Sequence, residues 1–350
     1  MTQSSNNSSK PQPSHSPSFP PPVFSSPSQD VDKPAIPYTK GQKFDVFRHI
    51  PPPPLGRPYP NSRSITPRKT LRYLTQFEYC LSAQPLDGVT KDHEASSFIV
   101  TEELAIRDGR GAQIVRVNDG LVAKIYDPLY YPSYHENTSI RADVVEWAER
   151  DYSREAAAYE ELNGRFGGTI IPKYHGSWTC HIHVNTTSGI IKRPVRLILM
   201  EWIEGVSMLK LQADQLSEEQ KSNIMVKAIE AEVAVNHHGV EQGDFAPRNV
   251  LCSGNDLGSA TLRVVLIDFN RSIILRLVKL RHTPSKLPIS PIVQFWAGDP
   301  EFNVEWLPYP PEEWLWKHWG DSPSYQPVIR GKERPPIRPP PSQSRSAVKV

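Results

Sequence analysis

Cysteine is scarce in this sequence, and long apolar runs are missing. The cysteines are only Cys80, Cys180 and Cys252, which lie far apart and form no CxxC pair. Such spacing argues against structural disulfides and against a zinc site. No run approaches the ~18 consecutive apolar residues of a membrane span, and the N-terminus lacks the apolar segment of a secretory signal. We therefore expect a soluble intracellular protein, cytoplasmic or nuclear, that makes no membrane contact.

An excess of one charge is also missing. The chain has 40 Lys and Arg residues against 38 Asp and Glu residues, a formal net charge of +2. Composition therefore gives no reason to expect nucleic acid as a partner. Proline, by contrast, is abundant: there are 36 prolines, while only 38% of the residues are hydrophobic. Part of the chain is therefore expected to stay outside any packed core.

The prolines are concentrated near the two ends. Residues 1–68 are rich in Ser, Pro and Asn and include the run Pro51 to Pro54, and residues 330–350 repeat this character with Lys and Arg added. Such segments bury too little apolar surface to offset chain entropy, so we expect disordered tails. They could instead bind a partner, through Pro-rich motifs or through the basic residues. The ordered domain is then expected over residues 70–326.

The first part of that domain shows a β pattern. Apolar residues favour strands over residues 97–106, 113–117 and 121–126, and Asn118-Asp119-Gly120 is a strong hairpin signal between the last two. We expect an antiparallel meander here, and two further strands over residues 170–178 and 196–203.

Two helices are expected beside these strands. The first covers residues 142–162, and Glu155 falls in the middle of its inward-facing stripe. A carboxylate facing a core is costly unless a cation meets it, so either Glu155 has a basic partner or the stripe is tilted and Glu155 is solvated. The second helix starts at a capping box, Ser217 with Gln220, and runs to about His237. The fold class is therefore α+β.

Oxygen ligands follow the second helix. Asp244 and Asn249 lie in a polar loop that leads into a short apolar strand, and the strand over residues 262–267 leads directly into Asp268. Two such strands side by side would bring these three side chains around one pocket. Asp and Asn oxygens suit a hard cation such as Mg²⁺, which also binds substrate phosphates. An Asp without a metal to bind can accept a proton from an attacking hydroxyl group.

The segments DFAPRNVL and VVLIDFN resemble the catalytic loop and the metal-binding motif of the protein-kinase-like superfamily. Residues 122–125 (VAKI) are similar to its lysine strand, and Glu155 to the helix glutamate that pairs with that lysine. Residues 197–205 resemble the strand and hinge that contact adenine. The resemblance covers about residues 98–272, and the closing Trp-rich stretch is similar to kinase-like proteins of fungi.

The resemblance implies a bilobal protein-kinase-like fold, with an antiparallel β small lobe (about 70–203) and a shortened, mainly helical large lobe (about 204–326). It implies ATP and Mg²⁺ as cofactors. Lys124 and Glu155 would act with Asp244 in catalysis, and Asn249 and Asp268 would hold the metal. The nucleotide would be contacted by Gly109, Gly111, Ala123, Lys124, Met200, Glu201 and Ile203. The implied function is a phosphotransferase, Ser/Thr type by default, that moves the γ-phosphoryl group to a protein hydroxyl.

Several positions depart from the family pattern. Ile114 stands where a third loop glycine would fall, Gln242-Gly243 precedes Asp244, and Ala246 replaces the lysine expected beside the γ-phosphate. Two alternatives therefore stay open. One is a pseudokinase, which uses the same fold as a binding or scaffolding module. The other is a small-molecule kinase of the aminoglycoside or choline type, whose Gly-Asp pairing is similar.

After Ser272 the sequence is shorter than the large lobe of the family would need. Residues 273–282 are basic and apolar and could form a single helix. A stretch with five tryptophans follows, at positions 296, 306, 314, 316 and 319. We expect these rings to pack back onto the domain; a surface that stacks bases or binds peptide is the alternative.

Overall fold

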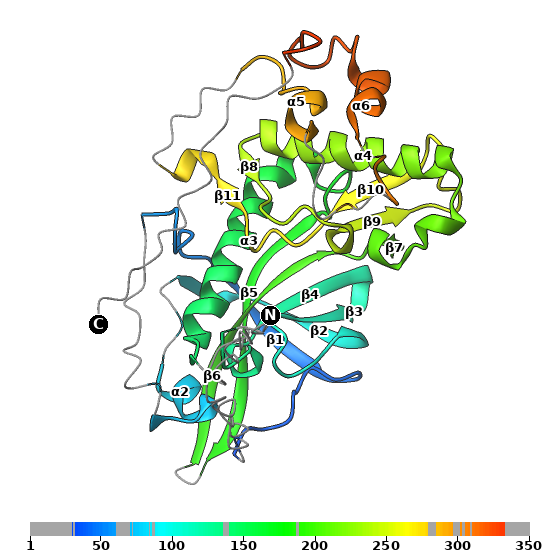
Figure 1. The fold of residues 1–350 in the computed structure, drawn as a ribbon. Helices are drawn as coiled ribbons and strands as arrows, with labels where there is room; N and C mark the ends of the chain where they lie inside the picture. Colours follow the sequence, from blue (N-terminus) through cyan, green and yellow to red (C-terminus); the bar gives the residue numbers. More distant parts are fainter. Residues whose placement is uncertain are drawn as a thin grey trace, which may run out of the picture.

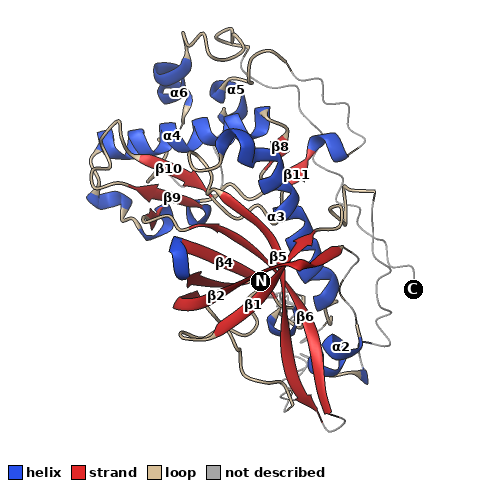
Figure 2. Ribbon diagram, turned by 180° about the vertical axis from the view of Figure 1, so that it is seen from behind, coloured by secondary structure: helices blue, strands red, loops and turns tan. Residues whose placement is uncertain are grey.

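A computed structural model describes residues 30, 32–60, 71, 73–83, 85, 88–135, 140–186, 189–278, 285–296, 302, 305–308 and 310–332. Figures 1 and 2 show a closed sheet, one long helix along it, and beyond them a part with further helices and short strands. None of the helices in these ranges has both the length and the apolar character needed to cross a membrane.

Six antiparallel strands form the sheet, in the order β1-β2-β3-β4-β6-β5. Their bounds are β1 Lys43–Ile50, β2 Val89–Ala105, β3 Gln113–Val117, β4 Leu121–Tyr126, β5 Tyr174–Thr186 and β6 Gly189–Glu201. The sheet closes where β1 pairs with β5, with Val46 opposite Cys180. The expected meander is confirmed in β2, β3 and β4, and the later strand pair is confirmed as a longer hairpin. The structure is thus α+β with an antiparallel sheet.

The expected N-terminal tail is wrong for residues 32–60. β1 lies inside that segment and supplies the strand that closes the sheet. Val46 is buried, and the Phe44 ring packs 5.5 Å from that of Phe98 on β2. Composition averaged over the Pro-rich segment hides this short β-forming stretch, because the prolines lie on either side of the strand and not within it. Of the two predicted tails, residues 1–29, 31, 61–68 and 333–350 lie outside the described residues.

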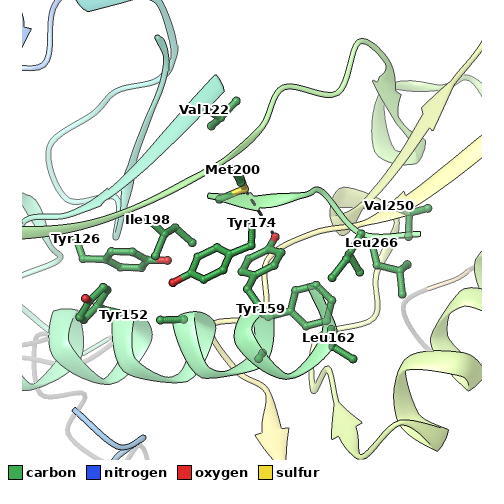
Figure 3. Packing of buried hydrophobic residues seen from close by; sticks show 14 of the residues in the cluster. Val122, Tyr126, Tyr152, Tyr159, Leu162, Tyr174, Ile198, Met200, Val250 and Leu266 are labelled. Atoms are coloured by element: carbon green, nitrogen blue, oxygen red, sulfur yellow. Dashed lines mark hydrogen bonds between the residues drawn. The ribbon is translucent and has the colours of Figure 1, made fainter. Parts of the chain in front are cut away.

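Helix α3 (Val144–Phe166) lies along the closed sheet. The Asp143 side chain caps its first turn by accepting from the Glu146 N–H. Tyr152, Tyr159 and Leu162 point from α3 toward the strands and are fully buried (Figure 3). The helix continues one turn past the predicted stop at Asn163-Gly164 and ends before Gly167. A short helix, α2 (Gln76–Ser82), precedes it in the chain.

The part beyond the closed sheet contains α4 Glu218–His237, α5 Pro291–Phe295 and α6 Glu312–Trp319. Two small sheets accompany it, β10-β9-β7 and β11-β8. Their strands are β7 Val206–Ser207, β8 Val240–Glu241, β9 Val250–Ser253, β10 Arg263–Leu266 and β11 Ile273–Ile274. Single 3-10 turns occur at Asn118–Gly120, Pro128–Tyr130, Met208–Lys210, Ala213–Gln215, Pro247–Asn249 and Leu275–Leu277. The capping box predicted at Ser217 is confirmed.

The single helix predicted over residues 273–282 is wrong. Ile273 and Ile274 form β11, which pairs with β8, and a 3-10 turn follows. Pairing with a distant strand outweighs the local pattern there; residues 279–284 lie outside the described residues. The packing expected for the tryptophans is confirmed, since all five rings contact the core, either buried or partly buried.

Candidate functional site

The centre of the candidate site is the ammonium group of Lys124. Lys124 lies on β4, between Ile114 of β3 and Ile198 of β6. Its Nζ is 2.5 Å from Glu155 Oε2 and 2.6 Å from Asp268 Oδ1. Strand, helix and loop, distant in sequence, therefore bring a cation and two carboxylates together. The prediction that Glu155 meets a basic partner inside the fold is confirmed.

Glu155 is held by more than this ion pair. Its side chain is 0% exposed, and Oε2 also accepts a hydrogen bond from the Tyr126 hydroxyl at 2.8 Å. Its other oxygen, Oε1, accepts from the Phe269 N–H at 3.3 Å. Both carboxylate oxygens thus have donors, which a buried carboxylate requires. One α3 residue thereby orients both Lys124 and the backbone beside Asp268.

The charges of this cluster shift one another. Burial would lower the pKa of Lys124, but the charges of Asp268 and Glu155 outweigh it and raise this pKa. Burial raises the pKa of Glu155 despite Lys124. For Asp268, burial acts upward, yet the charge of Lys124 and its hydrogen bond leave the pKa lowered. Asp268 is therefore the carboxylate of the two whose pKa is lowered, and its side chain is 33% exposed. That combination suits a ligand for a hard cation.

A further acid lies one turn before Glu155 on α3. Asp151 is partly buried, and burial raises its pKa to about 7, against the opposing charges of Arg150 and Lys124. The Tyr131 hydroxyl is 3.5 Å from its Oδ2. Sequence reasoning missed this residue, because nothing in its local pattern separates it from an ordinary solvated helix position.

Asp268 has an unusual backbone conformation. Its φ is +63°, and among the described residues it is the only non-glycine with a positive φ. Such a conformation is mildly strained and persists only where the surroundings hold it. The next residue, Phe269, is fully buried, and its ring is 5.3 Å from that of Tyr159. The buried Phe269 and its N–H bond to Glu155 fix the direction of the Asp268 side chain.

The loop from Asp244 to Asn249 is closed by its own side chains. Asn249 Nδ2 donates to the Asp244 backbone oxygen and to Asp244 Oδ2, both at 2.9 Å. Arg248 Nη2 donates to Asp244 Oδ1 at 2.6 Å. A second cation, Arg271, reaches the same oxygen at 3.7 Å. Asp244 is therefore well oriented, and both of its carboxylate oxygens are engaged.

This loop and Asp268 meet at the same end of two paired strands. β9 and β10 pair with Val250 opposite Leu266, and one step further the Ile267 N–H donates to the Asn249 oxygen at 2.9 Å. Gln242 Nε2 donates to the Ile267 oxygen at 2.8 Å. Asp244, Asn249 and Asp268 thus lie at the same end of this strand pair, called the edge below, as the strand pattern predicts.

A Mg²⁺ ion bound with a nucleotide fits this edge. Asn249 uses only its amide nitrogen in the bonds above, so its Oδ1 is free to ligate, and Asp268 uses only Oδ1, toward Lys124. Among the described residues, no three His, Cys, Asp or Glu side chains group closely enough to hold a metal. Two protein oxygens are the number that Mg²⁺ uses when phosphates and water supply the rest.

The turn between β2 and β3, called the glycine turn because it contains Gly109 and Gly111, is fixed by hydrogen bonds. Gly109 has φ +71°, and its N–H donates to the Tyr130 oxygen at 3.1 Å and to Asp108 Oδ1 at 2.8 Å. The buried Gln113 side chain bonds the backbone of Arg107 and of Gly111. The turn is thus a closed unit, and the Gly109 N–H is already bonded. Sequence reasoning missed the role of Gln113.

The expected hinge continues from β6. Met200 is buried opposite Val122, and the Tyr159 hydroxyl lies 3.7 Å from its sulfur (Figure 3). The Glu201 N–H donates to the Lys173 oxygen at 2.9 Å, and its carboxylate forms a bidentate pair with Arg263. The Ile203 N–H has no hydrogen bond to the described part of the chain. A free donor at this edge is what recognition of an adenine ring nitrogen needs. Ala123, also fully buried, lies on β4 beside Lys124.

No protein-family model matches this chain, and no curated protein matches it. The geometry of the site therefore carries the functional argument. A buried lysine fixed by glutamate can neutralise a polyphosphate, and a partly exposed Asp at the same strand ends as an Asn side chain can hold its counterion. An oriented Asp on the same edge can position a hydroxyl group.

Proposed function

We propose that the chain is a protein-kinase-like phosphotransferase that moves the γ-phosphoryl group of Mg-ATP to a hydroxyl group on a protein. The observation that carries this proposal is the position of Lys124 between Glu155 and Asp268. A purely structural buried ion pair needs one carboxylate. Here a second, partly exposed carboxylate is added, and it lies at the edge that also holds Asn249.

Each residue then has a chemical task. Phosphate oxygens of the nucleotide would replace Asp268 as partners of Lys124, while Glu155 keeps the ammonium in place. Asn249 and Asp268 would hold Mg²⁺, which offsets negative charge on the transferring group. Asp244 would orient the acceptor hydroxyl and take its proton. The backbone at Glu201 and Ile203 would bind adenine beside Met200, and the glycine turn with Ala123 would lie along the nucleotide.

The proposal extends to the architecture. It assigns the closed sheet and α3 to a small lobe that binds nucleotide, and α4 with the elements after it to a shortened large lobe. The site residues would then lie where the two lobes meet: Lys124 and Glu155 come from one, and Asp244, Asn249 and Asp268 from the other.

A second candidate function is a nucleotide-binding module without turnover. Two observations favour it. Both oxygens of Asp244 are engaged, by Arg248 and by Asn249, so a hydroxyl group would have to share an oxygen that already accepts one of these bonds. Ala246, where a lysine would touch the γ-phosphate, is fully buried. Either feature would slow phosphoryl transfer while leaving nucleotide binding intact.

Calorimetry of ATP binding with and without Mg²⁺, combined with assays of ADP release and of phosphate transfer to casein, separates the candidates. We expect the parent to bind and turn over, Asp268→Asn to weaken Mg²⁺-dependent binding at least ~10-fold, and Asp244→Asn to bind but lose turnover. Asp268→Asn keeps a side chain that tolerates positive φ. Asp214 is exposed, so Asp214→Asn is the matched control and should change neither nucleotide binding nor turnover. Binding without turnover in the parent would select the binding module, and a parent that binds no nucleotide would refute both.

A further inference from the structure

The segment that follows β1 crosses the molecule to the candidate site. Residues 51–60 leave the sheet and run beside α3 (Figure 1). Leu55 and Tyr59 of this segment are buried. None of these residues belongs to the site described above, and their composition predicts a tail. Their contacts nevertheless concern two of its elements, the turn of α3 that carries Glu155 and the chain that follows Asp268.

The contact with α3 is made through Arg154, the neighbour of Glu155. Arg154 Nε donates to the Leu55 oxygen at 3.0 Å, and Nη2 donates to the Arg57 oxygen at 2.7 Å. Its guanidinium carbon lies 5.4 Å from the centre of the Tyr59 ring, within cation–π range. One side chain of α3 therefore holds the segment at three points.

The contact with the Asp268 chain is made through the Tyr59 hydroxyl. It donates to the Ser272 oxygen at 3.0 Å and accepts from the Ile274 N–H at 2.8 Å. Alternate residues of a strand direct their backbone groups to opposite edges. Tyr59 therefore satisfies the edge of β11 that faces away from β8, as a neighbouring strand would. The hydroxyl is 213 positions from Ser272 in the chain.

β11, through its pairing with β8, in turn connects Asp268 with Asp244. Ile273 pairs with Glu241 of β8. Asp268 precedes β11 closely, and Asp244 follows β8 closely. Their relative position depends on this two-residue ladder as well as on the β9–β10 pair and the Gln242 bond to Ile267. The ladder is too short to be stable alone. The positive φ of Asp268 also requires surroundings that hold it.

We propose that Tyr59 is a positioning residue, which holds β11, and with it Asp268 and Asp244, against the α3 turn that carries Glu155. Its importance for phosphoryl transfer rests on the proposed function; its effect on the order of the Asp268 segment does not. Loss of the hydroxyl leaves a buried carbonyl and a buried N–H without these partners. Among the described residues, the backbone bonds that then remain to β11 are those of its pairing with β8.

Tyr59→Phe is the test, because it removes both hydrogen bonds and keeps the ring over Arg154. The control is Tyr38→Phe, which removes another buried hydroxyl, bonded to Asp127 Oδ2 at 2.5 Å between the chain before β1 and the chain after β4. Two readouts are compared with thermal stability: hydrogen exchange of amides 266–276, and the kcat and KM of ATP turnover. We expect Tyr59→Phe to speed exchange in this segment about 10-fold and to lower kcat about 10-fold at similar KM. Tyr38→Phe should change stability alone.

Unchanged exchange over residues 266–276 in Tyr59→Phe would overturn the proposal, whether or not the parent is an enzyme. Faster exchange with unchanged kcat would overturn its catalytic part. A parent without turnover counts against the proposed function instead, and the exchange experiment still decides whether Tyr59 orders the segment. Equal exchange effects of the two variants over residues 266–276 would show a general loosening of the fold and also overturn the proposal.

Discussion

The Lys124 ammonium and the Glu155 carboxylate form an ion pair of 2.5 Å in which the lysine side chain is 8% exposed and the glutamate 0%. The same helix offers a surface counterpart, Glu161, whose partner Arg276 is 65% exposed at 2.7 Å. The two pairs have similar geometry but different surroundings. Desolvation, rather than distance, therefore decides what each contributes.

Glu155→Gln should lower the free energy of unfolding by about 3 kcal/mol, the lower end for a broken buried pair, because Asp268 still faces Lys124. Glu161→Gln should cost less than ~1 kcal/mol, since water screens that pair. Urea unfolding of both variants at pH 7 measures the difference. Equal losses would show that the buried pair contributes no more than a surface one.

Gly243, directly before Asp244, should tolerate no side chain. Its φ is +75°, and a Cβ there would lie 2.7 Å from the Arg271 backbone oxygen. Gly239 is the matched control, with φ +90° and no atom within 4 Å of a Cβ. Gly239→Ala should cost about 1 kcal/mol from backbone strain alone, and Gly243→Ala at least ~2–3 kcal/mol. Urea unfolding compares them, and similar losses would mean that the close approach relaxes freely.

The close contact between position 243 and the Arg271 carbonyl also explains the sequence before Asp244. Any residue with a side chain at position 243 would meet the Arg271 carbonyl, so glycine is required there. The sequence alone shows only that a glycine precedes Asp244. Its structural reason involves a residue 28 positions later in the chain.

Part of the cluster around Lys124 could be predicted from local patterns, since Glu155 lies in a helical stripe and Asp268 follows an apolar run. Lys124 itself is expected only from the resemblance of residues 122–125 to a lysine strand. Tyr59 and Arg154 could not be predicted, because their bonds join parts of the chain that no local pattern connects. Strand β1 could not be predicted for a different reason. Its Phe44 and Val46 form a strand only because β2 and β5 are there to pair with it.

Trp319 should contribute to the core and not to a binding surface. It is buried, its Nε1 donates to Glu230 Oε1 of α4 at 3.1 Å, and its ring is 5.5 Å from that of Trp314. Trp319→Ala should destabilise the protein by about 3–5 kcal/mol, whereas the exposed Leu209→Ala should change stability by less than ~0.5 kcal/mol. Thermal unfolding followed by tryptophan fluorescence measures both. A marginal effect at Trp319 would favour a surface role for this stretch.

Stability below neutral pH should depend on His49 of β1. Its side chain is buried, and burial, together with the charge of Arg196, lowers its pKa to about 3. In the unfolded chain the pKa is about 6.5, so between these values the unfolded state binds a proton that the native state does not. The stabilisation is complete above pH 6.5 and is lost as the pH falls toward 3. At pH 5 the loss is about 2 kcal/mol.

His49→Gln should therefore make the fall in unfolding free energy between pH 7.5 and pH 5 smaller by about 2 kcal/mol, whatever it does to stability at pH 7.5. His93→Gln is the control, because that side chain is 80% exposed, and it should leave the pH dependence unchanged. Urea titrations of the parent and of both variants at the two pH values give the three falls in unfolding free energy to compare. An unchanged pH dependence in His49→Gln would show that His49 is protonated in the folded protein, against its buried position beside Arg196.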